Sequence, residues 1–171
     1  MLLKKIKPHS ASGPDSVSAW MLRSFADVAS PSIASLFNLS LRLGKLPKDW
    51  KLSNVVPIPK GTNMSEVQFY RPISLLPLIS KTLECHVQSF LLEHLNTMCF
   101  LSDSQFGFRS GRCTSTPLLI AVHRWHSFLE RRMRVGCIFI DLKKAFNSVP
   151  HQALLNKLSN LNLPPHLFAW L

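Results

Sequence analysis

Acidic residues are scarce in this sequence. Its 171 residues contain 9 Asp and Glu against 20 Lys and Arg, which gives a formal net charge of +11. An excess of positive charge favours a polyanionic partner, most often nucleic acid. The alternative is a basic protein with no such partner. The scarcity of carboxylates also restricts the places where a metal ion could be held.

Closely spaced cysteines, a leader peptide and long apolar runs are also missing. The four cysteines form no C-x-x-C pair, so neither a zinc ribbon nor a disulfide framework is indicated, and Cys85 and Cys137 are interpreted as buried thiols. We therefore expect reduced thiols and an intracellular location, either cytoplasmic or nuclear. The first residues become charged too soon for a signal peptide, and no run approaches the roughly 20 apolar residues of a membrane span. No membrane partner is expected.

Apolar periodicity predicts a folded, mostly helical chain. An apolar content of 46% suffices for a core. Helical spacing of apolar residues recurs in several segments, with Ser30-Pro31 predicted to open the second helix and Asn147 or Ser148 to cap the last. The segments are residues 17–25, 33–41, 79–98, 118–129 and 154–161.

Two kinds of extended segment accompany these helices. Residues 54–59 and 70–77 flank a turn at 60–63, which predicts a hairpin whose prolines bar it from the middle of a sheet. A β-leaning run from Val135 ends on Asp141 and predicts a strand that leads into a last helix. The element order predicts an α+β or mixed α/β fold.

Asp141 is the first candidate for chemistry. A carboxylate at a strand end beside basic residues can ligate Mg²⁺ against phosphates, and the backbone carbonyl of Leu142 can assist. One carboxylate cannot build a two-metal site, so a second acidic element is required. The alternative is an Asp that caps the following turn.

Other candidates are basic or aromatic. Lys60 at the hairpin tip and Arg71 on its return arm can clamp a triphosphate, or they can be two solvated charges on an edge ribbon. Phe146 can press against a nucleotide sugar and exclude a 2′-hydroxyl, or it can be a core residue.

A glycine-rich loop is the last candidate. Its glycines would allow a backbone to approach a phosphodiester, while its arginines would contact phosphates or stack on bases. It lacks the order of a P-loop, and a tight interhelical turn is the alternative. The residues concerned are Gln105, Gly107, Arg109, Gly111 and Arg112.

The order of these segments is more specific than any one of them. Along the chain stand Gly13-Pro14-Asp15, Leu46-Pro-x-Asp-Trp-Lys51, Val56-Pro-x-Pro-Lys60-Gly61, Tyr70-Arg-Pro-Ile-Ser-Leu-Leu76, Gln105-x-Gly-Phe-Arg-x-Gly-Arg112 and Asp141-Leu-x-Lys-Ala-Phe146-x-x-Val-Pro-His151. Together they resemble the reverse transcriptases of non-long-terminal-repeat (LINE-like) retrotransposons. The resemblance covers nearly the whole chain.

The resemblance implies a partial right-hand polymerase, with residues 1–134 as fingers and residues 135–171 as the truncated beginning of the palm. It implies that Asp141 is the first catalytic aspartate and a Mg²⁺ ligand, and that Phe146 is the sugar gate. Lys60 and Arg71 would hold the phosphates of the incoming deoxynucleotide, and the 105–112 loop would grip the template. The implied partners are an RNA template, a DNA primer and deoxynucleotide triphosphates.

Two departures from the family pattern bear on activity. Asn147 stands where the family usually has Asp, and the chain contains no Asp-Asp pair for the second palm motif. We therefore expect a fragment, cut near its apolar end at residues 167–171, that needs the missing palm and thumb of a longer polyprotein and binds Mg²⁺ weakly or not at all. The alternative is a non-enzymatic relic or domesticated fragment that binds nucleic acid.

Overall fold

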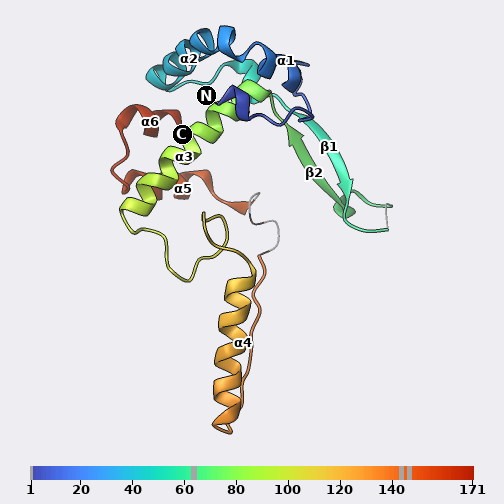
Figure 1. Cartoon of the computed structure of the whole chain (residues 1–171), viewed down its shortest axis with the longest axis vertical. Helices are drawn as coiled ribbons and strands as arrows, with labels where there is room; N and C mark the ends of the chain where they lie inside the picture. The colour runs from blue at the N-terminus through green and yellow to red at the C-terminus, as the bar shows by residue number, and fades with distance from the viewer. Residues whose placement is uncertain (1, 63–64, 143–144, 146–147) are drawn as a thin grey trace. The chain divides into compact units, whose positions relative to one another are not determined.

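The computed structural model describes residues 2–62, 65–142, 145 and 148–171. They form two compact units, one of residues 1–89 with 151–171 and the other of residues 90–150. Helices dominate, and the described strands form one two-stranded sheet (Figure 1). The expectation of a helix-rich α+β fold is confirmed at this level.

The first unit begins with a short 3-10 helix, η1 (Leu3–Lys5), followed by α1 (Ala19–Ser24) and α2 (Ala26–Leu43). The Ser18 hydroxyl caps α1 by accepting a hydrogen bond from the Met21 amide at 3.2 Å. Helix α2 ends at Gly44, whose φ of 59° lies in the left-handed region that glycine tolerates. The predicted stop at Gly44 is thus confirmed.

The predicted start of α2 at Ser30-Pro31 is wrong. The helix begins at Ala26, and Pro31 lies inside it. Ala26 is fully buried, so packing favours a helix that already includes it. Proline at this position lacks the N–H that would bond to the carbonyl four residues earlier, and its ring crowds that carbonyl.

The hairpin is confirmed. A 3-10 turn, η2 (Lys48–Lys51), leads into β1 (Asn54–Pro59), which pairs antiparallel with β2 (Tyr70–Leu75) after a further turn, η3 (Val67–Phe69). The Lys60 amide donates to the Phe69 carbonyl at 2.8 Å, so hydrogen-bonded pairs fall at every second residue from there. All three strand prolines occupy the alternate positions, where no inter-strand N–H is needed, and this is why the ribbon tolerates Pro57, Pro59 and Pro72.

Helix α3 (Leu78–Thr97) carries the core of the first unit. Its residue Leu78 packs in one cluster with Ala19 and Leu22 of α1. Gly13 lies against the backbone at Pro77, where a Cβ would come within 2.4 Å of the Pro77 nitrogen. The N-terminal segment is therefore seated on the start of α3.

Two helices complete this unit, α5 (His151–Ser159) and α6 (Pro165–Trp170). Helix α6 contacts α2: the Trp170 indole donates to the Ser40 hydroxyl at 3.0 Å, and Leu167 is buried. Because α5 begins at His151, after Pro150, the predicted cap at Ser148 is wrong; Asn147 lies outside the described residues.

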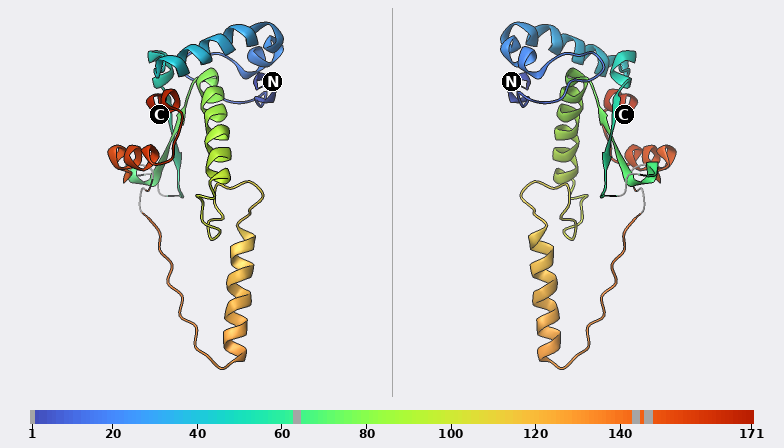
Figure 2. Two further views of the ribbon diagram at one scale, coloured as in Figure 1. Left: turned by 90° about the vertical axis from the view of Figure 1, so that its left-hand side faces the viewer. Right: turned by 90° about the vertical axis from the view of Figure 1, so that its right-hand side faces the viewer.

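The second unit contains α4 (Ser115–Glu130), which has no buried residue. The chain then turns at Arg132 and continues without helix or strand through Asp141, diverging from α4 in Figure 2. The predicted strand over 135–141 is therefore wrong, and Ile138, Phe139 and Ile140 are 90%, 87% and 85% exposed. A strand exists only when its backbone bonds to a neighbour, and no described strand pairs with this segment.

The structure also bears on the cysteines and on possible membrane spans. All four cysteines are exposed, so the interpretation of Cys85 and Cys137 as buried thiols is wrong. Among the helices that the structure describes, none combines the length and the apolar character needed to cross a bilayer.

Candidate functional site

The hairpin places its two candidate cations on one face. Ile58 pairs directly with Arg71, and the hydrogen bond from the Lys60 amide to the Phe69 carbonyl extends the same register by two residues. Residues opposite each other share a face, as do alternate residues of one strand. Lys60 and Arg71 are consequently diagonal neighbours on one side of the ribbon, and Ile58, opposite Arg71, shares that side.

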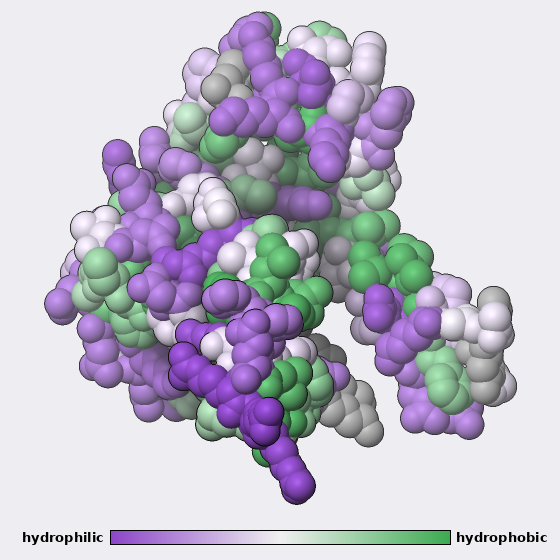
Figure 3. All heavy atoms as spheres, turned by 60° about the horizontal axis from the view of Figure 1, so that its bottom comes forward, coloured by the Kyte–Doolittle hydropathy of each residue, from purple (hydrophilic) through white to green (hydrophobic). Residues whose placement is uncertain are grey.

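This face is open to solvent. Lys60 and Arg71 are both exposed, and the strands show mixed apolar and hydrophilic surface at the right of Figure 3. The Lys60 amine donates to the Gln68 carbonyl at 2.7 Å, a contact within the hairpin's own return arm. Among the described residues, Arg71 forms no ion pair. The Lys60 ammonium and the Arg71 guanidinium thus lie on the same face, and this combination is suited to binding phosphate oxygens.

Asp141 and Leu142 lie in the second unit, on the segment without regular structure. Both are exposed, Leu142 by 72%. No cluster of three or more His, Cys, Asp or Glu that could hold a metal ion occurs in the part of the chain that the structure describes. Asp141 offers the hard oxygen that Mg²⁺ prefers, but these residues do not assemble a complete magnesium site. Phe146 lies outside the described residues.

The 105–112 loop is organised by an acid that the sequence interpretation did not single out. The Asp103 carboxylate forms an ion pair with the Arg112 guanidinium at 2.7 Å and lies 3.9 Å from the Arg109 guanidinium. Arg109 also donates to the Ser102 carbonyl at 2.8 Å. The signal available in the sequence was one carboxylate a few residues before two arginines in a chain with few acids.

The arginines therefore brace the loop from within. Their side chains are only 17% and 25% exposed, and the Arg112 guanidinium lies 5.3 Å from the centre of the Phe106 ring. The Gln105 side chain likewise donates to the Gly107 carbonyl at 3.2 Å. The two arginines and Gln105 thus have structural contacts, as the interhelical-turn alternative expects, and the predicted role in template binding stays a prediction.

The two glycines of the loop differ in whether the backbone conformation calls for glycine. Gly111 has a φ of +74°, which a side chain rarely adopts, whereas no unusual φ accompanies Gly107. A Cβ at either position would meet nothing within 4 Å. Packing within the chain does not require glycine at 107.

Cys113 follows the loop directly. The Cys113 sulfur lies 3.3 Å from the Thr116 hydroxyl, and hydrogen bonds from Thr116, then Ser115, lower the pKa of the Cys113 thiol below its ordinary value. The sequence offered no signal for this, since neither residue belongs to a recognisable motif.

Comparison with known proteins identifies one family. Residues 58–171 match the family described as reverse transcriptase (RNA-dependent DNA polymerase). The chain is 34% identical over 98% of its length to the RNA-directed DNA polymerase from mobile element jockey of Drosophila funebris. It is 32% identical over 95% of its length to a probable RNA-directed DNA polymerase from transposon X-element of Drosophila melanogaster. In both cases the chain spans only 18% of the relative's length.

Proposed function

The chain belongs to the reverse transcriptase family, and we propose that it forms the fingers and the first part of the palm of a non-LTR retrotransposon polymerase. The relatives described above support the family, and both are named as RNA-directed DNA polymerases of mobile elements. The observation that carries the proposal is the shared face of Lys60 and Arg71 on the hairpin. Residues 1–134 would be the fingers and 135–171 the beginning of the palm.

The hairpin face would hold the phosphates of a deoxynucleotide triphosphate. A lysine and an arginine on adjacent diagonal positions supply two charge-assisted contacts to one triphosphate. The Lys60 amine would exchange the Gln68 carbonyl for a phosphate oxygen, so little rearrangement of the ribbon is needed. Phe146 would act as the sugar gate.

The 105–112 loop would lie along the template. Nothing within the chain would clash with a side chain at position 107. A polynucleotide that approaches the backbone closely at this position would explain why glycine is there. In this arrangement Arg109 and Arg112 keep the loop in shape, and their remaining donors and the Gln105 amide face the polynucleotide. The template class would be RNA, with a DNA primer.

Catalysis would belong to the intact parent protein, with Asp141 and the Leu142 carbonyl contributing to its metal site. The described residues supply too few ligands for that site, and the whole chain has no Asp-Asp pair. We therefore expect weak or absent Mg²⁺ binding and no DNA synthesis by the 171 residues alone. Mg²⁺-dependent primer extension by the isolated chain would overturn this part of the proposal.

Nucleotide binding is the direct test of the hairpin. Fluorescence anisotropy with a labelled deoxynucleotide triphosphate should show about tenfold weaker binding for Lys60→Gln with Arg71→Gln, because two exposed charge-assisted contacts are lost. The matched control is Arg42→Gln with Lys48→Gln, which removes the same charge from exposed positions of the same unit. Equal affinities for the two double variants would refute a phosphate site on this ribbon.

A second candidate function is non-enzymatic nucleic-acid binding. The net charge of +11 together with the incomplete metal site favours it. It predicts affinity that falls steeply with salt and shows little preference among bases. No binding to single-stranded RNA or DNA at low salt would exclude both candidates.

A further inference from the structure

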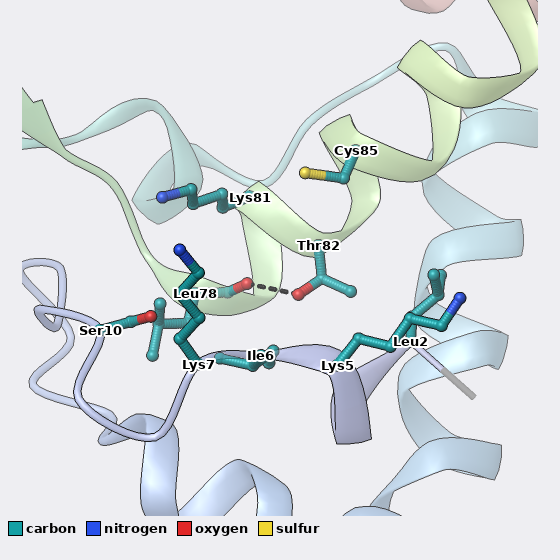
Figure 4. A pocket seen from close by; sticks show the side chains of 9 residues that line it. All are labelled: Leu2, Lys5, Ile6, Lys7, Ser10, Leu78, Lys81, Thr82 and Cys85. Carbon is teal, nitrogen blue, oxygen red and sulfur yellow. Dashed lines mark hydrogen bonds between the residues drawn. The ribbon is translucent and has the colours of Figure 1, made fainter. Parts of the chain in front are cut away.

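A pocket of about 430 Å³ lies within the first unit, between the N-terminal segment and the start of α3. Figure 4 shows side chains from both segments facing each other across it. Leu2, Ile6 and Leu78 provide apolar walls, and none of the lining residues is acidic. Its volume falls within the range of about 300–1,000 Å³ that is typical of ligand sites.

Three lysines surround this apolar space. The amines of Lys7 and Lys81 lie at one end in Figure 4 and that of Lys5 at the other. Their neighbour Lys4 pairs with Asp27 at 2.8 Å, whereas the pocket lysines form no ion pair among the described residues. An anion between them would balance a cluster of charge that the chain leaves unneutralised.

Lys81 stands at an unfavourable place for a cation. It occupies the first turn of α3, where the helix dipole already presents partial positive charge. For an exposed side chain this repulsion is small, and a bound anion would offset it. Together with the pocket and the two other lysines, it indicates a site for negative charge.

We propose that this pocket binds single-stranded nucleic acid, with a base against the apolar walls and the flanking phosphates on Lys5, Lys7 and Lys81. The inference rests on the proposed function and adds a contact surface outside the hairpin and the 105–112 loop. A lone phosphate would leave the apolar walls unused, and cations at both ends of the pocket call for more than one anion. Nucleic acid provides an apolar face and one phosphate per nucleotide.

Cys85 makes the pocket accessible to measurement. Its exposed thiol lines the space beside Thr82, whose hydroxyl is already committed to the Leu78 carbonyl at 2.7 Å. A bound base would shield the thiol from an alkylating reagent. The thiol at Cys137, in the other unit, is also exposed and serves as an internal reference.

The first test is binding of a labelled single-stranded dT oligonucleotide to the whole chain. Removing the three pocket charges should weaken binding about tenfold. It should also reduce the magnitude of the slope of log K against log salt by about 2, because each lost phosphate contact contributes about 0.7. The control removes three exposed lysines elsewhere in the same unit and should change affinity less than threefold. The pocket variant carries Lys5→Gln, Lys7→Gln and Lys81→Gln; the control carries Lys45→Gln, Lys48→Gln and Lys51→Gln. Equal losses would overturn the proposal.

The second test is alkylation of Cys85 by iodoacetamide, followed by mass spectrometry. The oligonucleotide should slow modification of Cys85 several-fold more than that of Cys137, and an abasic oligonucleotide should protect less. Binding without protection of Cys85 would overturn the pocket assignment and leave the proposed function standing. No binding of the oligonucleotide at all would overturn both. Equal protection by tripolyphosphate or by anionic lipid vesicles would show that the ligand class is wrong.

Discussion

Gly13→Ala tests how the N-terminal segment is seated. A Cβ at this position would lie 2.4 Å from the Pro77 nitrogen, 2.6 Å from the Leu76 carbonyl carbon and 2.7 Å from the Pro77 Cα. All three are backbone atoms, and Pro77 is fully buried, so no flexible side chain can move aside. The two segments must separate by about 1 Å to restore ordinary contact, against a core packed to crystal-like density.

The cost follows from overpacking. Inserting a methyl group into a packed core costs about 1–3 kcal/mol. For a chain of this size, each kcal/mol lowers the melting temperature by about 2–4 °C, so we expect Gly13→Ala to melt about 2–12 °C below the unchanged protein. Thermal unfolding followed by circular dichroism measures the shift, and urea titration gives the change in free energy of unfolding.

Gly61→Ala is the matched control. A Cβ there meets nothing within 4 Å, and its φ lies outside the range that disfavours a side chain, so the change should stay within about 0.5 kcal/mol. If Gly13→Ala and Gly61→Ala proved equally stable, the close approach of the N-terminal segment to α3 would be refuted. The pocket beside that contact would lose its support as well.

Three further changes test other contacts. Trp170→Phe should cost about 1 kcal/mol, because the Ser40 hydroxyl loses its indole donor; a double-mutant cycle with Ser40→Ala should show the coupling, and additive effects would contradict it. Asp141→Asn should leave the melting temperature unchanged, with or without Mg²⁺, because this exposed residue belongs to no described metal cluster; stabilisation by Mg²⁺ that the variant abolishes would contradict that. Thr116→Val should raise the pKa of the Cys113 thiol, since its largest lowering influence is removed, so half-maximal alkylation moves to higher pH; an unshifted profile would argue against the hydrogen bond.

Local patterns predicted local elements well. The helix of residues 79–98 follows from its apolar stripe, and α3 spans Leu78–Thr97. The hairpin follows from two extended runs around a turn, and the stop of α2 from Gly44. Each depends on a few neighbouring residues, so the chain carries the necessary information within a short window.

Predictions that needed a distant partner fared worse. The run ending at Asp141 has the composition of a strand, but composition supplies no neighbour for its backbone, and none pairs with it among the described strands. Ser30-Pro31 has the composition of a helix start, yet burial of Ala26 favours an earlier one. In both places tertiary context outweighs local preference.

The amino-acid sequence by itself determined the family, the basic charge and the positions of the hairpin, the glycine-rich loop and Asp141, because each depends on residue types in order along the chain. Only the tertiary structure decided that Lys60 and Arg71 share one face, that Asp103 braces the loop arginines, and that three lysines meet around an apolar pocket. The physical reason is that strand register, ion pairing and the seat of Gly13 on Pro77 join residues through space, and their geometry exists only once the chain has folded.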